Sequence, residues 1–343
     1  MVDDFRIGSH SVSPGDRRVV HLSAARLYDF TEMSIPVCVI HGKKPGPVLF
    51  VSGAIHGDEI NGVEIVRRLL KLKVLNQLHG TLIAIPIVNV FGYNSRSRYL
   101  PDRRDLNRCF PGSANGSLGS RLAHIFMEEI VLKSTHGIDL HTGAIHRKNL
   151  AQVRAVMEHP ENKKLAPLFG APVVLNSELR DGSLRQAAQD IGIPVLLYEA
   201  GEALRFEEKA IQMGVTGILQ VMKEIGLIEA LPKGSKSKNK VGQIAKSSYW
   251  IRAPQSGTLI KRRKLGSRVG KGELLGYITD PFGHHRVEIE AQHPGLIIGA
   301  TTLPLINRGD AIFHQAVFED LDLATEMVEL FNEDFIDMER TPY

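Results

Sequence analysis

Between residues 46 and 230, short apolar runs alternate with stretches in which apolar residues recur at steps of three and four. The short runs predict strands and the periodic stretches predict amphipathic helices. The predicted strands are 48–52, 81–88, 137–141, 173–175 and 195–199. The predicted helices are 61–73, 120–133, 184–191 and 207–225. This alternation predicts an α/β domain in which helices cover both faces of a sheet.

The flanking residues have other patterns. Residues 1–45 predict a β-rich lead-in to the first domain, which we expect to span residues 1–230. Residues 231–248 are rich in Lys, Gly and Ser and predict a basic linker. Residues 249–343 contain short strands punctuated by glycines, which predict a small all-β domain, a β-sandwich with a C-terminal extension.

Composition and charge narrow the kinds of partner. Hydrophobic residues make up 43% and charged residues 23%, which is ordinary for a soluble globular protein. The net charge is +4, but the main basic cluster lacks aromatic residues for base stacking, so we expect no nucleic acid. No apolar run approaches the roughly 20 residues that span a bilayer. With only two cysteines and no secretory core at the N-terminus, we expect a cytoplasmic protein. The oligomeric state stays open, a homo-oligomer included.

The segment after strand 48–52 has the spacing of a metal site. It reads Gly-Ala-Ile-His-Gly-Asp-Glu over 53–59 and places His56 and Glu59 three residues apart around a helix entry. Strand 137–141 ends on a second histidine, His141. Two histidines and a glutamate leave one tetrahedral position of a zinc ion open, as in catalytic zinc sites. The His-x-x-Glu pair alone is more often a helix start with a capping acid, and the strand before it and the later histidine favour the metal site.

Polar side chains cluster at the ends of several predicted strands. His56, Asn89, His141 and Glu199 all lie at or just past such ends. In open α/β sheets, the carboxyl ends of the strands are where ligands bind, so we expect one composite site. Glu199 is a candidate general base. The alternative is a strand-end acid that pairs with a lysine or caps a turn.

A loop over 96–108 carries the arginines Arg96, Arg98, Arg103, Arg104 and Arg108. Guanidinium groups bind carboxylates in a bidentate manner, so the loop predicts binding of an anionic substrate. An ordinary solvated basic loop would have the same composition. The sequence Asp-Leu-Asn-Arg over 105–108, followed by Phe-Pro-Gly, favours substrate binding.

These motifs, in this order, resemble the succinylglutamate desuccinylase/aspartoacylase family, relatives of the zinc carboxypeptidases. The resemblance covers residues 46 to about 225 and implies a zinc-carboxypeptidase-like mixed sheet. It implies one zinc ion per chain and a set of site residues. The implied roles are metal binding by His56, Glu59 and His141, α-carboxylate binding by Asn107 and Arg108, activation of the attacking water by Glu199, and polarisation of the scissile carbonyl by Arg98, with Arg103 or Arg104 as alternatives for the last role.

The implied activity is zinc-dependent removal of an acyl group from a small-molecule N-acyl amino acid or related amine. The alternatives are a carboxypeptidase-like metallopeptidase and a binding protein that keeps the fold without a competent metal. Family members specific for acidic acyl groups carry a further arginine before the catalytic glutamate, where this chain has Arg180 and Arg185. We also expect Asp139 or Asp58 to orient a zinc-binding histidine.

The C-terminal part resembles a biotinyl/lipoyl-type β-sandwich. Its hairpin region, residues 279–285, lacks the sequence Met-Lys-Met, so we expect no attached biotin or lipoate. His284 and His285 in that hairpin are expected to be turn residues.

Overall fold

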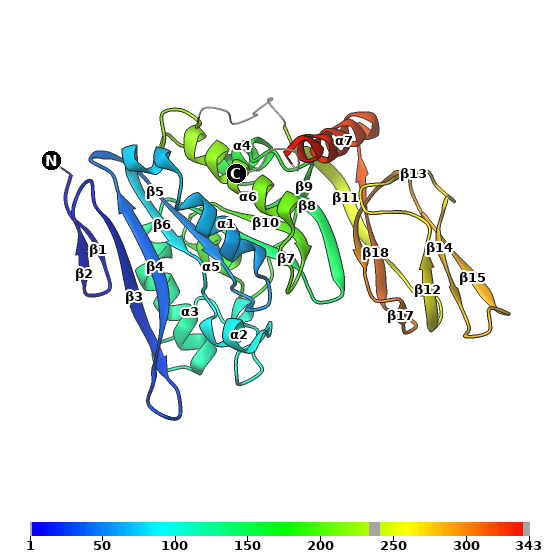
Figure 1. Cartoon of the computed structure of the whole chain (residues 1–343), viewed down its shortest axis with the longest axis horizontal. Coiled ribbons are helices and arrows are strands. Elements are labelled where there is room, and N and C mark those ends of the chain that lie inside the picture. Colours follow the sequence, from blue (N-terminus) through cyan, green and yellow to red (C-terminus); the bar gives the residue numbers. More distant parts are fainter. Residues whose placement is uncertain (1, 233–240, 339–343) are drawn as a thin grey trace.

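The computed structural model describes residues 2–232 and 241–338, and within them twelve strands form one large mixed sheet (Figure 1). Its strands are β3 (Arg17–Arg26), β4 (Glu32–His41), β5 (Lys44–Gly53), β6 (His79–Ile85), β7 (His136–Gly143), β8 (Arg147–Ala155), β9 (Val173–Asn176), β10 (Val195–Glu202), β11 (Gln243–Arg252), β13 (Arg268–Val269), β16 (Gly295–Thr301) and β18 (Ala311–Phe318). Across the sheet their order is β13-β16-β18-β11-β9-β8-β10-β7-β5-β6-β4-β3. The neighbours β10, β7, β5 and β6 run parallel, whereas β4 and β3 continue the sheet antiparallel.

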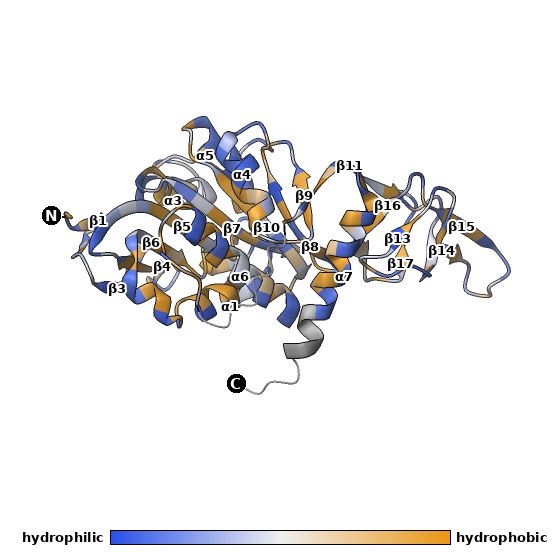
Figure 2. Ribbon diagram, turned by 90° about the horizontal axis from the view of Figure 1, so that it is seen from above, coloured by the Kyte–Doolittle hydropathy of each residue, from blue (hydrophilic) through white to orange (hydrophobic). Residues whose placement is uncertain are grey.

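Helices cover both faces of this sheet, as predicted. One apolar core lies beneath α1 (Asn61–Leu69), α4 (Pro160–Leu168) and α6 (Glu208–Glu224). The second lies beneath α2 (Val90–Ser95), α3 (Leu118–Glu129) and α5 (Leu184–Asp190). Strand β5 contributes to both cores because its side chains point alternately to the two faces of the sheet. Leu49 and Val51 belong to the first core and Phe50 to the second. In Figure 2 the central strands are mostly hydrophobic, whereas the helices contain both hydrophobic and hydrophilic residues.

Strand β8 was not predicted. It contains Arg147, Asn149, Gln152 and Arg154, and its apolar–polar alternation is confined to residues 151–155. It forms because its backbone pairs with β10, β9 and β16, which places it deep inside the sheet. Polar side chains are unusual on a strand in the interior of a sheet. The cavity described below explains why β8 carries them.

The C-terminal part is a β-sandwich. A sheet of β12 (Gly257–Lys261), β14 (Leu274–Thr279), β15 (Arg286–Glu290) and β17 (Leu305–Ile306) packs on the β13-β16-β18-β11 end of the large sheet. The apolar core between them includes Leu259, Leu275, Ile278 and Phe313. Helix α7 (Leu321–Met338) packs against β11, β16 and β18. His285 lies in the β14–β15 turn, where its backbone N–H donates to Asp280.

The two parts of the chain are joined more closely than expected. Residues 243–248 belong to the expected linker, but they are the first residues of β11, which pairs with β9 and with β18. The large sheet therefore continues from the α/β part into the sandwich. The remainder of the basic linker, residues 233–240, lies outside the described residues.

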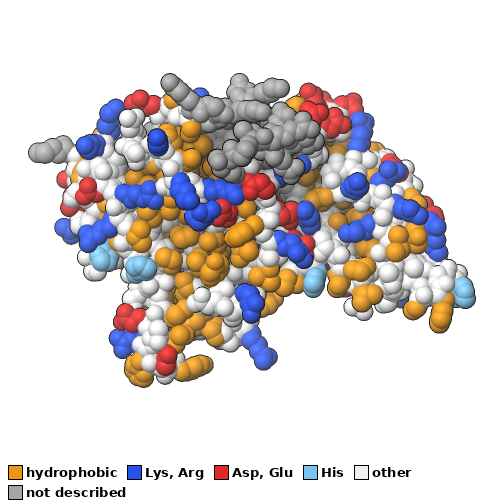
Figure 3. All heavy atoms as spheres, viewed as in Figure 1, with side chains coloured by type: hydrophobic (Ala, Val, Ile, Leu, Met, Phe, Trp, Pro, Cys, Tyr) orange, Lys and Arg blue, Asp and Glu red, His pale blue; other side chains and the backbone are white. Residues whose placement is uncertain are grey.

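The lead-in is β-rich, as predicted. It contains β3, β4 and a separate hairpin of β1 (Phe5–Ile7) and β2 (His10–Val12). On the face seen in Figure 3, basic and acidic side chains are interspersed with hydrophobic ones. No helix among the described residues has the length and apolar character needed to cross a bilayer.

Candidate active site

His56 and Glu59 lie in a tight turn between β5 and α1. The backbone N–H of Glu59 donates to the carbonyl of His56 at 3.1 Å, and the helix begins only at Asn61. Both residues therefore precede the helix. The turn packs directly on α2, since a Cβ at Gly57 would lie 2.0 Å from the carbonyl carbon of Gly92. Only glycine allows this approach, which fixes where His56 points.

Glu59 bridges two histidines from different elements. Its Oε1 lies 2.8 Å from Nδ1 of His56, and its Oε2 lies 2.7 Å from Nδ1 of His141 on β7. All three side chains are buried, and their ligand atoms lie within 4.8 Å of one another. Two imidazole nitrogens and a carboxylate are ligands that Zn²⁺ prefers, so this His–Glu–His group fits a metal ion.

A carboxylate lies behind each histidine. Nε2 of His56 lies 3.0 Å from Oδ1 of Asp105, and Nε2 of His141 lies 2.7 Å from Oδ2 of Asp139. Such contacts turn Nδ1 of each ring toward the same point, as is typical of metal-binding histidines. Asp139 makes the histidine contact that we expected of Asp139 or Asp58. Within the described residues the buried Oδ1 of Asp58 has no hydrogen-bond partner, and the carboxylate that contacts His56 is that of Asp105.

The carboxylates of Glu59, Asp105 and Asp139 favour positive charge on His56 and His141. Burial alone would lower the pKa of His141, but Asp139 and Glu59 outweigh it and raise that pKa to about 10. The pKa of His56 is raised in the same way, against burial, by Glu59 and Asp105. The pKa of Glu59 lies well below its usual range, because the two histidines outweigh its burial. A metal cation would supply the charge that protons supply here.

Arg98 contacts the same group. Its guanidinium lies 2.9 Å from Oε1 of Glu59 and 3.1 Å from Oδ2 of Asp105. Of the three arginines considered for carbonyl polarisation, only Arg98 lines the cavity, whereas Arg103 and Arg104 are exposed at the surface. Asn89 does not line the cavity either, although we expected it to belong to the composite site. It caps α2 by accepting a hydrogen bond from the N–H of Gly92 at 2.8 Å.

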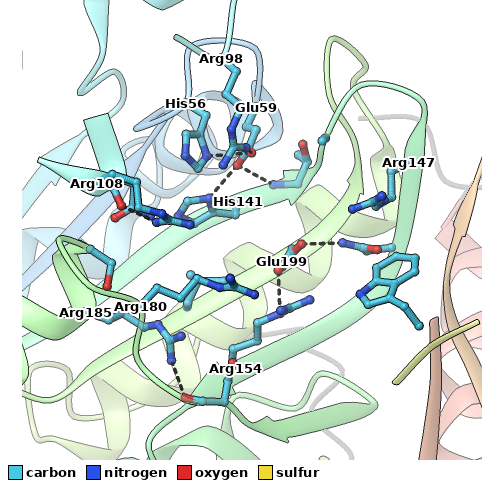
Figure 4. Close-up of a pocket in the computed structure, with 18 residues that line it drawn as sticks. His56, Glu59, Arg98, Arg108, His141, Arg147, Arg154, Arg180, Arg185 and Glu199 are labelled. Carbon is cyan, nitrogen blue, oxygen red and sulfur yellow. Dashed lines mark hydrogen bonds and ion pairs between the residues drawn. The ribbon is translucent and has the colours of Figure 1, made fainter. Parts of the chain in front are cut away.

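The His56–Glu59–His141 group and Arg98 form one wall of a cavity of about 320 Å³ (Figure 4). The cavity is strongly basic. Its lining includes two glutamates, Glu59 and Glu199, and six arginines, Arg98, Arg108, Arg147, Arg154, Arg180 and Arg185. Arg185 is buried, and burial together with the neighbouring Arg154 lowers its pKa to about 10. Among the described residues, its guanidinium donates to the backbone carbonyls of Ser177 and Glu178, at 3.3–3.4 Å.

Glu199 projects into this cavity from β10. Its Oε1 accepts a hydrogen bond from Nδ2 of Asn149 at 2.6 Å, and its Oε2 forms an ion pair with Nε of Arg154 at 2.7 Å. Both partners come from β8, which pairs with β10. In Figure 4 Glu199 lies between His141 and Arg154, and in the sheet it pairs with His141 across β10 and β7. The carboxylate is therefore held in place on the strand next to that of His141.

Asn107 and Arg108 lie on a short turn, η2 (Leu106–Arg108), at the other side of the cavity. The side-chain oxygen of Asn107 accepts a hydrogen bond from the N–H of Leu184 at 2.9 Å, which leaves its amide N–H groups as donors. Arg108 donates to the carbonyl of Asn107 and has an exposed side chain. The pair offers several N–H donors to a carboxylate.

Sequence reasoning missed part of the lining. Arg147, Asn149 and Arg154 lie on β8, and Trp250 comes from β11 of the sandwich. The available signal was the alternation Ala-Gln-Val-Arg-Ala over 151–155, which is short and follows the polar residues 147–149.

Residues 45–225, more than half of the chain, match the model of the succinylglutamate desuccinylase/aspartoacylase catalytic domain. The chain belongs to this family. The resemblance seen in the sequence is thereby confirmed. Members of the family hydrolyse amide bonds, so the protein is a hydrolase of this class.

Similar proteins support this assignment. An N-α-acetyl-L-2,4-diaminobutyric acid deacetylase from Halomonas elongata is 25% identical over 288 residues, which cover 81% of this chain and 84% of the relative. A crystal structure of a succinylglutamate desuccinylase/aspartoacylase from Rhodobacter sphaeroides has a TM-score of 0.79 at 24% identity, covering 89% of this chain and 96% of the other. The ectoine utilization protein EutE (DoeB) from Ruegeria pomeroyi, in a product-bound structure, has a TM-score of 0.78 at 23% identity and covers 89% and 97%. These two structures share the fold.

Proposed function

We propose that the protein is a zinc-dependent amidohydrolase that removes the acyl group from an N-acyl amino acid or a related amine. The observation that carries the proposal is the position of the buried His56–Glu59–His141 group, which shares one cavity with Glu199. Metal ligands with an open position and a nearby carboxylate base are the parts that hydrolysis of an amide needs.

Asn107, Arg108, Glu199 and Arg98 each have a role in the proposed reaction. Asn107 and Arg108 bind the α-carboxylate of the substrate and so place its amide bond beside the metal-binding group. A zinc ion bound there would act as a Lewis acid toward the carbonyl and would acidify water. Glu199 accepts the proton of the attacking water and passes it to the leaving amine. Arg98 donates to the carbonyl oxygen as negative charge develops on it.

The positive charge of the cavity lining limits which amino acid the substrate can contain. The named substrate of the Halomonas elongata relative, acetyl-diaminobutyric acid, carries a second amino group. In this chain six arginines and only two glutamates line the cavity, and a zinc ion would add further positive charge. A second ammonium group would be repelled there. We therefore propose amino acids with neutral or acidic side chains as the amine half of the substrate.

A substrate panel tests the proposal against the carboxypeptidase-like alternative. The zinc-loaded protein is given N-acetyl derivatives of aspartate, glutamate, leucine and 2,4-diaminobutyrate, together with dipeptides that end in the same amino acids. We expect release of the amino acid from the acetyl derivatives, least from diaminobutyrate, and no release after chelation of the metal. Cleavage of the dipeptides in preference to the acetyl derivatives would instead establish a peptidase.

A further inference from the structure

Asn149 holds one oxygen of the Glu199 carboxylate. Its Nδ2 donates to Oε1 at 2.6 Å, whereas Nε of Arg154 pairs with Oε2 at 2.7 Å, and dashed lines in Figure 4 mark both contacts. A carboxylate that is held at both oxygens has one orientation, whereas a carboxylate held at a single oxygen can turn about that contact. Without Asn149, the ion pair with Arg154 would leave the direction of Oε1 open.

Asn149 itself has little freedom. Its backbone lies between two strands, where it pairs with Gly201 of β10 and with Gly299 of β16, and its side chain is buried. With the amide turned over, Oδ1 would face the carboxylate of Glu199, and two acceptors do not form a hydrogen bond. Oδ1 therefore points away from Glu199, and among the described residues this buried atom has no hydrogen-bond partner. Only the atoms packed around Oδ1 limit how far the amide can shift on that side.

The C-terminal sandwich leaves a space for Oδ1 at Gly299 of β16. A Cβ at Gly299 would lie 2.7 Å from Oδ1 of Asn149, closer than two such atoms can approach. It would also lie 3.0 Å from Cβ of His314 and 3.5 Å from the indole of Trp250. Gly299 is not among the glycines with a positive φ, so its backbone does not require glycine. Because glycine weakens the interior of a strand, its presence here indicates a close approach, and the close neighbour is Asn149.

We propose that Asn149 is a positioning residue for the base Glu199, and that Gly299 of the sandwich sets the place of Asn149. A side chain at position 299 would push the amide off its hydrogen bond, and Glu199 would lose its orientation. The metal-binding residues would keep their places, because they lie on β7 and on the turn after β5. This inference rests on the proposed function, because it takes Glu199 as the base. It gives the sandwich a part in catalysis through the space that it leaves open.

Two single variants test the positioning. Gly299→Ala and Asn149→Ala are made in the full chain, loaded with zinc and given the N-acetyl amino acid that the panel above identifies. We expect each variant to lower kcat by about 10- to 100-fold, the usual effect of a small misplacement of a reacting group. KM and bound zinc should stay as in the wild type. A normal kcat in Asn149→Ala, or a loss that appears only in KM, would overturn the proposal.

A double variant separates positioning from general damage to the fold. The Cβ at position 299 acts through Oδ1 of Asn149, so Asn149→Ala removes the atom that it would meet. The double variant Asn149→Ala/Gly299→Ala should therefore have the kcat of Asn149→Ala alone, since the two changes act on one contact. Losses that multiply would overturn the role of Gly299. The control is Gly270→Ala in the same sandwich, where an added Cβ would lie 3.7 Å from its nearest neighbour, and kcat should be normal.

Crystal structures decide the question even without turnover. The zinc-loaded wild type, Asn149→Ala and Gly299→Ala are compared at the side chain of Glu199. One orientation in the wild type and a displaced carboxylate in both variants, with His56, Glu59 and His141 unmoved, supports the positioning even if no acyl amino acid is cleaved and the proposed function has failed. An unmoved Glu199 in both variants contradicts the positioning even if deacylation is observed.

Discussion

Asp105 contacts His56 on the side of the imidazole away from Glu59, with 3.0 Å between its Oδ1 and Nε2 of the ring. The same Oδ1 accepts a hydrogen bond from the backbone N–H of Asn107 at 2.9 Å, and the other oxygen pairs with Arg98. One carboxylate therefore links the His–Glu–His group, the arginine beside it and the turn for which we propose α-carboxylate binding. Burial alone would raise its pKa, but His56 and Arg98 keep it well below the usual range.

We expect Asp105→Asn to weaken zinc binding by about 10- to 100-fold, the usual effect of removing a carboxylate behind a metal-binding histidine. Competition with a chromogenic chelator measures the affinity. The control is Asp102→Asn, which changes an exposed acid of the same loop paired with Arg104. Unchanged zinc affinity in Asp105→Asn would show that His56 needs no support from this carboxylate.

Glu199→Gln should lower kcat by about 100- to 10,000-fold, because the amide cannot accept a proton from water. Zinc content should stay as in the wild type, since Glu199 lies outside the His–Glu–His group. Metal analysis and turnover are measured on the same preparation. Glu178→Gln, at an exposed position, serves as the matched control. A Glu199→Gln enzyme of normal activity would remove Glu199 from the role of base.

Arg108→Lys should raise KM for N-acetyl amino acids by roughly tenfold or more, because lysine keeps the charge but loses the bidentate geometry. The effect should shrink for the corresponding amino-acid amides, which lack the α-carboxylate. Steady-state kinetics on the acid and amide series measures both. An equal change on both series would mean that Arg108 does not bind the carboxylate.

His314 gives the protein a pH dependence of stability. Burial, together with Arg154 and Arg147, lowers its pKa to about 3. A histidine with a lowered pKa in the folded state resists protonation, whereas the unfolded chain takes up the proton near pH 6.5. Stability is therefore lost as pH falls below about 6.5, by at most ~1.4 kcal/mol per pH unit from this group. Denaturant unfolding of wild type and His314→Gln at pH 7, 6 and 5 should show a smaller loss in the variant. Parallel pH profiles would contradict this.

The sequence predicted the features that rest on local pattern. His56 and Glu59 lie in one turn after an apolar strand, and His141 lies near the carboxyl end of another, so their convergence follows from the parallel order of β5 and β7. The helices on both faces of the sheet follow from their apolar periodicity. The family motif around residues 105–108 gave Asn107 and Arg108, which the structure places in the cavity.

The parts that could not be predicted depend on pairing between distant segments. In strand β8 the polar residues outnumber the apolar ones and the strand is held by its partners in the sheet, so its arginines could not be placed from local pattern. The start of β11 has the composition of a linker and becomes a strand by pairing with β9. The contact between Asp105 and His56 depends on the path of the loop over 96–108, which carries no periodic pattern. Trp250 reaches the cavity only because the large sheet continues into the sandwich.

Titration of metal-free protein with zinc tests the central claim most directly. The protein is stripped with a chelator, zinc is added in steps, and bound zinc and hydrolysis of an N-acetyl amino acid are measured on the same samples. The proposed metal site predicts no hydrolysis at the start and a rise in proportion to bound zinc, with a plateau at about one ion per chain. Full hydrolysis by the stripped protein, or none at one zinc per chain, would contradict it.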